Sequence, residues 1–434
     1  MDGYDFHSVS LSVSRLAVYY GQGKAEREHI SLSITLTLLF RSVGAIIFGL
    51  AGDLYGRKWP MVINLMVIAV LQLATAFCET FQSFLGVRAL FGIGMGGIWG
   101  LSASMALENM PMEARGLFSG ILQQGYALGY LIAAGINMGV VPNSKHSFKM
   151  LYYIGAGLTF AVALARCCFP ESKQFIEAKR NGGDEISGKM KVRLFMNDAR
   201  KILREYWKRC IYAVILMALF NYMSHTSQDM YPTYMQQTKG FSAMASSKAT
   251  MIAKTGAVVG GTFCGYYSQF FGRRATIMIA CALGAALIPL WVLPNTFASL
   301  VTGAFLLQFM VQGAWGVVPI HLNELSPPQF RSSFPGICYQ LGNMISAPAA
   351  QISATISESL EIHVRGEVRP DYAITQAIMM SVIFSLLLVW TACGQEQRGS
   401  HFELAKTAGE AEGKERELED GDKHGVEAVE MAQR

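Results

Sequence analysis

The chain contains a dozen apolar runs of roughly 20 residues, and this feature constrains the fold more than any other. A run of that length crosses the hydrocarbon core of a bilayer, about 30 Å thick, as an α-helix. Inside a bilayer the backbone has no water to bind, so helices and closed barrels are the viable spanning structures. Hydrophobic residues make up 52% of the 434 positions and charged residues only 15%, against about a quarter in a soluble domain. The sequence therefore predicts an all-α membrane protein.

The runs divide into two sets of six. We expect the first set near residues 1–18, 31–52, 60–78, 83–107, 115–140 and 150–169, and the second near 209–236, 247–270, 275–293, 297–320, 333–356 and 373–393. The predicted parts are an N-terminal transmembrane half (1–170), a cytoplasmic central loop (171–208), a C-terminal transmembrane half (209–394) and a cytoplasmic tail (395–434). The tail is Glu-rich and short of aromatic residues, a composition typical of disorder.

An internal repeat relates the two halves. GLAGDLYGRK at 49–58 matches GYYSQFFGRR at 265–274, a shift of 216 residues. The same shift carries Glu108 to Glu324, Pro111 to Pro327, Arg115 to Arg331, Gly120 to Gly336 and Gln124 to Gln340. Two six-helix halves joined by a basic loop indicate the major facilitator fold, whose parallel repeats enclose the substrate site.

The repeated decapeptide resembles the loop between spans two and three of major facilitator proteins, which acts as a cytoplasmic latch. The residues to which we assign a gating role are Asp53, Gly56, Arg57, Lys58 and Arg115 in the first half, and Gly272, Arg273, Arg274 and Arg331 in the second. Gln269 stands where the second copy would carry its acid, so we expect the second latch to be weaker. Glu108 and Glu324 fit either latch or packing roles.

The basic residues also set the topology. The loop 171–208 and the Lys and Arg residues of both latches all lie on one side of an alternating twelve-span trace. The positive-inside rule makes this side cytoplasmic. Both termini are then cytoplasmic in a multi-pass protein.

The first span is expected to be truncated. Under the 216-residue shift Met1 corresponds to Met217, whereas span seven begins near Arg209. The first 18 residues also contain Asp2 and Asp5, which makes them short and polar for a bilayer crossing. Two explanations stay open: the sequence starts at an internal Met of a longer gene, or the first helix is defective.

Polar side chains concentrate in one part of span seven, NYMSHTSQDMYPT. On helical spacing Asn221, His225 and Asp229 share one stripe, with Ser224 and Gln228 beside it. An Asp near the bilayer centre costs about 2.5–3.5 kcal/mol, so it normally faces a cavity or a partner. Histidine titrates near physiological pH, which makes the His–Asp pair a candidate proton relay. The alternative is a polar seam that joins helices through hydrogen bonds.

The same segment resembles the signature of the fungal Jen family of carboxylate:proton symporters, Asn-x-x-Ser/Thr-His-x-Ser/Thr-Gln-Asp-x-x-x-Thr, with every fixed position present. MDGYDFHSVSL, RALFGIGMGGIWG, YQLGN and GQEQRGSHFE resemble spans one, four, eleven and the end of span twelve in that family, and PESKQF resembles the sugar-porter branch. The resemblance implies a plasma-membrane symporter that imports small carboxylates by alternating access. It assigns proton coupling to His225 and Asp229. It assigns the substrate and its path to Arg88, Asn221, Ser224, Ser227, Gln228, Thr233, Gln340 and Asn343.

The chemistry of the intramembrane cations supports a carboxylate substrate. Arginine offers a bidentate fork that matches a carboxylate, which lysine does not. Arg88 fits either a substrate contact or a buried structural cation. Arg41 and Lys254 fit either a functional role or a structural one, in which the side chain snorkels or pairs locally. Gln124 is the repeat mate of Gln340, so we expect both to point into the central cavity and count both as substrate contacts.

Enzyme chemistry finds no support in the sequence. His225 and Asp229 are separated by three residues, whereas the acyltransferase pattern His-x4-Asp needs four. The Gly-rich segment 92–97 lies in a membrane span, where it favours close helix packing over nucleotide binding. We expect no enzyme activity, cofactor, metal or nucleic acid. We expect a monomer whose partners are a small carboxylate, protons and the lipid bilayer.

Several functional alternatives stay open. The substrate can be a lactate- or pyruvate-type monocarboxylate or a malate- or succinate-type dicarboxylate. The chain can instead be a transporter-like carboxylate sensor, an inactive truncated transporter, or a sugar-porter-like carrier of another small solute.

Overall fold

The computed structural model describes residues 2–20, 27–171, 176, 188–327, 330–364 and 367–398. The first half consists of α1 (Asp2–Tyr19), α2 (Arg27–Tyr55), α3 (Lys58–Phe77), α4 (Phe81–Glu108), α5 (Arg115–Gly139), the 3-10 turn η2 (Val141–Asn143) and α6 (Lys149–Cys168). The second half consists of α8 (Gly188–Gln228), α9 (Tyr231–Thr233), the π-helical turn η3 (Tyr234–Thr238), α10 (Ala243–Phe271), α11 (Arg273–Val292), α12 (Phe297–Leu325), α13 (Ser333–Ser346), α14 (Ala349–Ser359) and α15 (Tyr372–Cys393).

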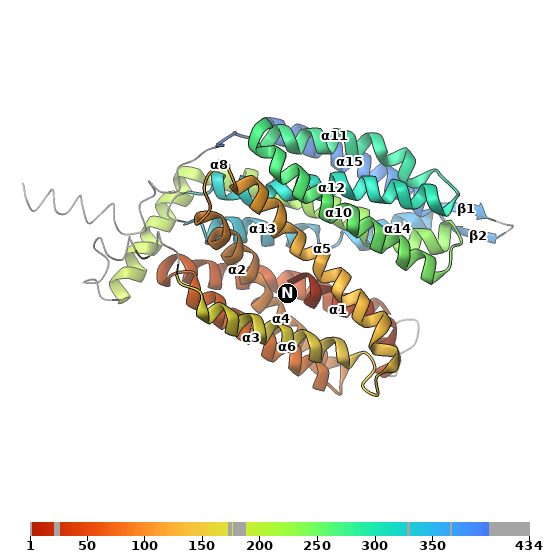
Figure 1. Ribbon diagram of the computed structural model, residues 1–434, viewed down its shortest axis with the longest axis horizontal. Helices are drawn as coiled ribbons and strands as arrows, with labels where there is room; N and C mark the ends of the chain where they lie inside the picture. The colour runs from red at the N-terminus through yellow and green to blue at the C-terminus, as the bar shows by residue number, and fades with distance from the viewer. Residues whose placement is uncertain are drawn as a thin grey trace, which may run out of the picture.

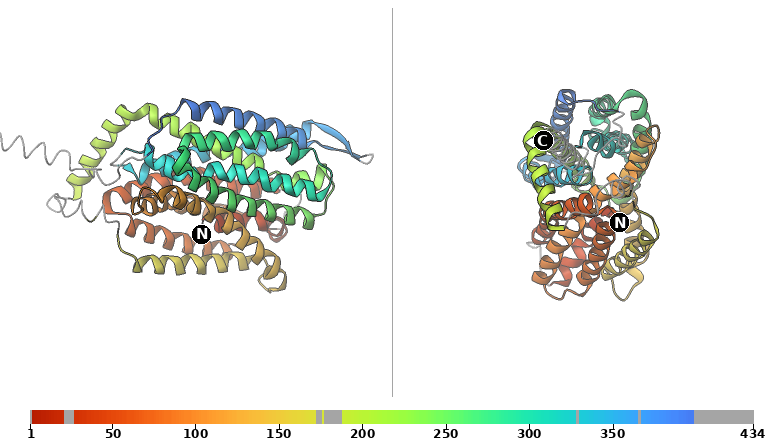
Figure 2. Two further views of the ribbon diagram at one scale, coloured as in Figure 1. Left: turned by 45° about the horizontal axis from the view of Figure 1, so that its top comes forward. Right: turned by 90° about the vertical axis from the view of Figure 1, so that its left-hand side faces the viewer.

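The two halves form two helical bundles that lie side by side (Figure 1), and the end-on view in Figure 2 shows the same division. At one end the N-terminal part of α8 extends beyond the bundles, and at the other end a hairpin of β1 (Glu361–Val364) and β2 (Glu367–Pro370) extends from the second half. The predicted helical architecture of two halves is confirmed. The hairpin has no counterpart among the elements predicted from the sequence.

Nine helical segments of the described chain are long and apolar enough to cross a membrane. The segments outside that set are α1, α10 and the α13–α14 pair. These helices pack against the other half or beside it: α10 contacts α5, α13 contacts α2, and α1 contacts α5. Because protein rather than lipid covers much of their surface, they need less hydrophobicity than the outer helices.

The repeat is visible at the level of single turns. Gly56 and Gly272 precede the third helix of each half with φ angles of 95° and 94°, a left-handed conformation that favours glycine. Thr80 caps α4 by accepting from the amide of Ser83, and Thr296 caps α12 by accepting from the amide of Ser299. The same turn chemistry therefore positions equivalent helices in both halves.

Two boundaries differ from the sequence prediction. The region 171–208 was expected to be a loop, but α8 begins at Gly188 and continues into the membrane span across a kink at Tyr206 (φ −107°, ψ 18°). The predicted span 333–356 is broken into α13 and α14, and Pro348, which lacks a backbone N–H, stands at the break. The predicted tail lies outside the described residues beyond position 398.

The polar side chains of α1 face protein partners. Asp2 forms an ion pair with Arg41 at 2.9 Å, and Asp5 is fully buried and accepts a hydrogen bond of 3.4 Å from Thr159 Oγ1. Tyr4 Oη donates to the carbonyl of Leu151 at 2.8 Å. These contacts explain how so polar a segment is held within the first bundle.

Candidate transport site

A cavity lies between the two halves, with about 480 Å³ of space among its lining residues when the part that is open solvent is counted. The lining residues are Phe6, Leu38, Arg41, Gln123 and Tyr126 from the first half, and Asn221, Ser224, His225, Gln228, Asp229, Gln312, Trp315, Tyr339 and Asn343 from the second. The wall combines aromatic rings, amides, a cation and an acid. Such a lining suits a small polar solute whose orientation is fixed by a few polar groups.

His225 and Asp229 form a direct contact at this cavity. His225 Nδ1 lies 2.8 Å from Asp229 Oδ2, across one helical turn. Asp229 directly follows the last residue of α8, and its amide still donates to the carbonyl of His225 at 3.0 Å. The Asp229 side chain is 39% exposed and that of His225 only 15%. The pair can therefore exchange a proton between an exposed carboxylate and a less exposed imidazole.

Other polar residues of α8 hold the helix and the cavity wall together. Ser224 Oγ accepts a hydrogen bond of 2.7 Å from Trp315 Nε1 of α12. Asn221 Nδ2 donates to the carbonyl of Met217 at 2.8 Å. Ser227 Oγ, behind the cavity wall, donates to the carbonyl of Ser224 at 3.3 Å. Thr233 does not line the cavity; it lies in α9.

The predicted glutamine pair does not line the cavity. Gln124 Nε2 donates to the carbonyl of Gly120 at 3.2 Å, and its side chain packs against α10. Its neighbour Gln123 lines the wall and accepts from Trp99 Nε1 at 3.2 Å. On α13 the lining residue is Asn343, whose Nδ2 donates to Gln340 Oε1 at 3.0 Å. Both predicted glutamines thus lie behind the wall.

The cation that lines the cavity is Arg41, not Arg88. The Arg41 side chain is paired with Asp2, and its guanidinium carbon lies 5.3 Å from the ring centroid of Phe6. Arg88 is buried in the first bundle, 4.1 Å from the ring centroid of Phe91, and its Nε and Nη1 have no hydrogen-bond partner among the described residues. In this conformation Arg88 does not line the cavity.

Several lining residues were not predicted from the sequence. They are Phe6, Leu38, Gln123, Tyr126, Gln312, Trp315 and Tyr339. In the sequence the aromatic residues among them cannot be told from ordinary core residues. Only the packing of the two halves brings their rings to one cavity. Polar spacing could have indicated Gln312, which lies in an apolar helix.

The first latch joins the two halves at the end of the cavity that carries the basic loops. Asp53 of α2 accepts hydrogen bonds from the amides of Ser332 and Ser333, at 3.0 and 2.9 Å, where α13 of the other half begins. A carboxylate at a helix N-terminus is favourable because it meets free N–H groups and the positive end of the helix dipole. Arg57 Nη2 lies 3.8 Å from Asp53 and 3.0 Å from Glu108.

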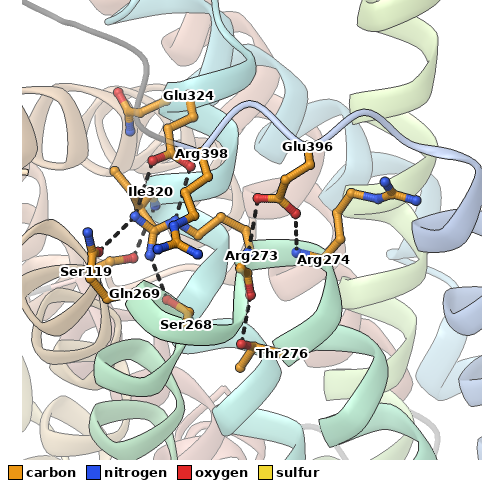
Figure 3. Close-up of polar contacts among 12 residues, drawn as sticks. Ser119, Ser268, Gln269, Arg273, Arg274, Thr276, Ile320, Glu324, Glu396 and Arg398 are labelled. Carbon is orange, nitrogen blue, oxygen red and sulfur yellow. Dashed lines mark hydrogen bonds and ion pairs between the residues drawn. The ribbon is translucent and has the colours of Figure 1, made fainter.

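The second latch is drawn in Figure 3. Arg273 forms a bidentate pair with Glu324, with both N–O distances at 3.1 Å. Glu396 accepts from the amides of Arg273 and Arg274 at 3.1 and 2.9 Å. Arg274 Nε also donates to the carbonyl of Thr391 at the end of α15, at 2.9 Å. These contacts fasten α11, α12 and α15 within the second half.

The two latches correspond closely but differ in how they cross between the halves. In the first half the amides of Arg57 and Lys58 donate to Glu171 at 3.1 and 2.9 Å. In the second half Glu396 accepts from the equivalent amides of Arg273 and Arg274. Across the halves, however, the charged Asp53 accepts two bonds, whereas Gln269 Nε2 donates one, of 2.6 Å, to the carbonyl of Met112.

Ser119 of α5 makes a further contact between the halves. Its hydroxyl donates to the carbonyl of Gly316 at 2.7 Å and accepts from the amide of Ile320 at 3.0 Å, so it bridges two backbone groups of α12 (Figure 3). Helices α4 and α13 also approach closely at this end, since a Cβ atom at Gly100 would lie 2.9 Å from the Cα of Gly336.

The remaining gating candidates lie in the same region. Arg115 Nε donates to the carbonyl of Met110 at 3.0 Å. Burial lowers the pKa of Arg331, in the connection before α13, to about 10; the Glu108 carboxylate opposes this shift, and the charge of Arg57 reinforces it. The halves are therefore closed together at the end with the basic loops, while Asp229 stays exposed.

A membrane protein of two related bundles, with a polar cavity between them and contacts that close one end of it, has the architecture of a secondary transporter. The sequence model of the sugar (and other) transporter family matches residues 1–395, so the chain belongs to that family.

Known relatives agree with this assignment. A carboxylic acid transporter protein homolog of Saccharomyces cerevisiae is 34% identical over 408 residues, which cover 90% of this chain and 65% of that protein. This chain thus spans just under two thirds of the relative's length. A probable 4-methylmuconolactone transporter of Cupriavidus pinatubonensis is 24% identical over 361 residues, 80% of this chain and 78% of that protein. The resemblance to carboxylate transporters seen in the sequence is confirmed by the yeast relative.

Solved structures confirm the major facilitator fold. The proton:xylose symporter XylE of E. coli superposes with a TM-score of 0.70 at 15% identity, covering 93% of this chain and 94% of that one. The human organic anion transporter MFSD10 superposes with a TM-score of 0.60 at 16% identity, covering 89% of each chain.

Proposed function

We propose that this protein is a proton-coupled secondary transporter that imports small carboxylates by alternating access. The observation that carries the proposal is the His225–Asp229 pair, joined at 2.8 Å at a cavity between the two halves. An ionisable pair inside a membrane bundle costs free energy, and proton relays are a common reason for it. Because the pair borders the cavity, a proton and a solute can load from the same side.

The latches are the proposed gate. Alternating access requires the end with the basic loops to open while the opposite end closes. The contacts between the halves that must then break are those between Asp53 and α13, between Gln269 and the carbonyl of Met112, and between Ser119 and α12. Opening that end would release solute and proton to the cytoplasm, in a plasma-membrane protein with both termini cytoplasmic.

A carboxylate substrate fits the cavity wall. Asn221, Gln228 and Asn343 supply neutral amides, and Arg41 supplies a guanidinium group. The names of two relatives, the yeast carboxylic acid transporter homolog and a cis,cis-muconate transport protein of Acinetobacter baylyi, point to the same substrate class. Lactate- and pyruvate-type monocarboxylates and malate- and succinate-type dicarboxylates are the proposed substrates.

Three predicted substrate contacts lie behind the wall in this conformation. They are Arg88, Gln124 and Gln340. We keep them as proposed contacts of a different conformation, in which helix movement exposes them to the cavity.

Counterflow in proteoliposomes tests the proposal. Vesicles loaded with unlabelled lactate or succinate should take up the labelled form of the same acid, and vesicles loaded with xylose should not take up labelled xylose. Binding of a carboxylate without exchange would instead indicate a sensor. Exchange of xylose alone would indicate a sugar carrier.

A further inference from the structure

Lys254 of α10 is a buried cation at the edge of the cavity. Lys254 is only 4% exposed. Its Nζ lies 5.8 Å from the ring centroid of Tyr126 and 5.3 Å from that of Tyr130. Across the described parts of the chain no carboxylate lies within 4 Å of this ammonium group. Removing an ammonium ion from water is costly unless it is paired. A buried lysine without a carboxylate partner is therefore a candidate functional residue.

The hydrogen bond that Lys254 makes fixes the orientation of a cavity residue. Its Nζ donates to Gln228 Oε1. A lysine can only donate, so the amide oxygen of Gln228 must face Lys254 and the amide nitrogen must face away. Gln228 lines the cavity, and its Nε2 is buried without a hydrogen-bond partner in the described structure. An unpartnered N–H donor on a residue that lines a cavity is suited to a carboxylate oxygen.

Among the charged groups described around this point, Lys254 is the one without a carboxylate in direct contact. Arg41 of α2 is compensated by Asp2 at 2.9 Å. His7 of α1 is close enough to interact electrostatically with Lys254. It also packs against the same two tyrosine rings. Asp229 of α8 is also near enough to interact with Lys254, although the acid is in direct contact with His225.

We propose that Lys254 is the positioning and charge-compensating residue of a carboxylate subsite in which Gln228 Nε2 donates to the substrate. The inference rests on the proposed function and deepens it. When His225 carries a proton, the His225–Asp229 pair is neutral as a unit, and the charge of Lys254 balances the single negative charge of a carboxylate. When His225 is neutral, Asp229 takes up that charge and none is left for the anion. Carboxylate and proton therefore enter together.

Uptake of labelled lactate by proteoliposomes tests the subsite. Lys254→Met should raise the KM by roughly 10- to 150-fold, the range for losing a hydrogen bond that involves a charged group, with little change in kcat. Lys254→Arg, which keeps the charge and the donors, should restore most of the affinity. The matched control is Lys248→Met, on an exposed position of the same helix, and its KM should equal that of the wild type.

Two further variants separate a positioning role from a structural one. Lys254→Met and Gln228→Ala should be strongly non-additive in KM, because the lysine acts through the glutamine. Gln228→Glu gives Lys254 a counterion, so it should fold well, yet it removes both the N–H donor and the free charge and should abolish lactate uptake.

The outcomes are distinguishable from failure of the proposed function. A wild-type protein that exchanges neither lactate nor succinate refutes the transport proposal itself. An active wild type refutes this inference alone if Lys254→Met keeps the wild-type KM, if the two substitutions are additive, or if Gln228→Glu still transports lactate.

Discussion

Replacing Asp53 by Asn should loosen the closed end of the transporter. The carboxylate accepts two backbone N–H groups from α13 of the other half. Hydrogen bonds to a charged group contribute about 1.5–3 kcal/mol each and neutral ones about 0.5–1.5 kcal/mol, and the interaction with the helix dipole adds about 0.3–1 kcal/mol. Asn keeps one acceptor oxygen and loses the charge. We expect closure to weaken by at least about 2 kcal/mol, a shift of roughly 30-fold or more toward the open arrangement.

Hydrogen–deuterium exchange in nanodiscs measures this shift at the amides concerned. Peptides covering residues 332–346 should exchange faster in Asp53→Asn by a factor of the same order. The matched control is Asp371→Asn, because Asp371 also accepts two amides, at 2.9 and 3.1 Å, but caps α15 within its own half. Unchanged protection at the start of α13, or an equal loss in the control, would refute the reasoning.

Three further predictions concern the second latch, a turn and a buried cation. Gln269→Ala removes one neutral hydrogen bond between the halves, about 0.5–1.5 kcal/mol, and a bond from Arg273 that lies within the second half. Exchange before α5 should therefore rise less than in Asp53→Asn, and an equal rise would contradict the weaker second latch. Gly272→Ala places a side chain at φ 94° and ψ 159°, which costs about 1–3 kcal/mol. It should lower the thermal midpoint, whereas Gly86→Ala, with open space around it, should not. Arg88→Lys should weaken lactate affinity roughly 10- to 150-fold at normal surface expression; an unchanged KM would make Arg88 a structural cation.

The sequence predicted those parts of the molecule that depend on local spacing. Arg57 with Glu108, and Arg273 with Glu324, form ion pairs that are related by the shift of 216 residues. The constant shift placed these residues at equivalent positions of the two halves, although it left Glu108 and Glu324 open to either a latch or a packing role. His225 and Asp229 meet because a spacing of four residues places side chains one above the other on a helix.

The parts that depend on helix rotation and on packing between the halves could not be predicted. Gln123 and Gln124 are adjacent and equally polar, and about 100° of helix rotation decides which one faces the cavity. Arg41 and Arg88 are both arginines within apolar helices, and only the packing of the helices shows that Arg41 lines the cavity while Arg88 lies within the first bundle.

Proton-driven accumulation in proteoliposomes tests the central claim most directly. With an acidic outside and a more alkaline inside, the wild-type protein should accumulate labelled lactate against its gradient, and a protonophore should abolish the accumulation. Asp229→Asn and His225→Gln should lose this accumulation at equal protein content, because neither retains the proton-exchanging pair. Wild-type accumulation that persists after the proton gradient is collapsed, or that both variants retain, would contradict proton coupling through His225 and Asp229.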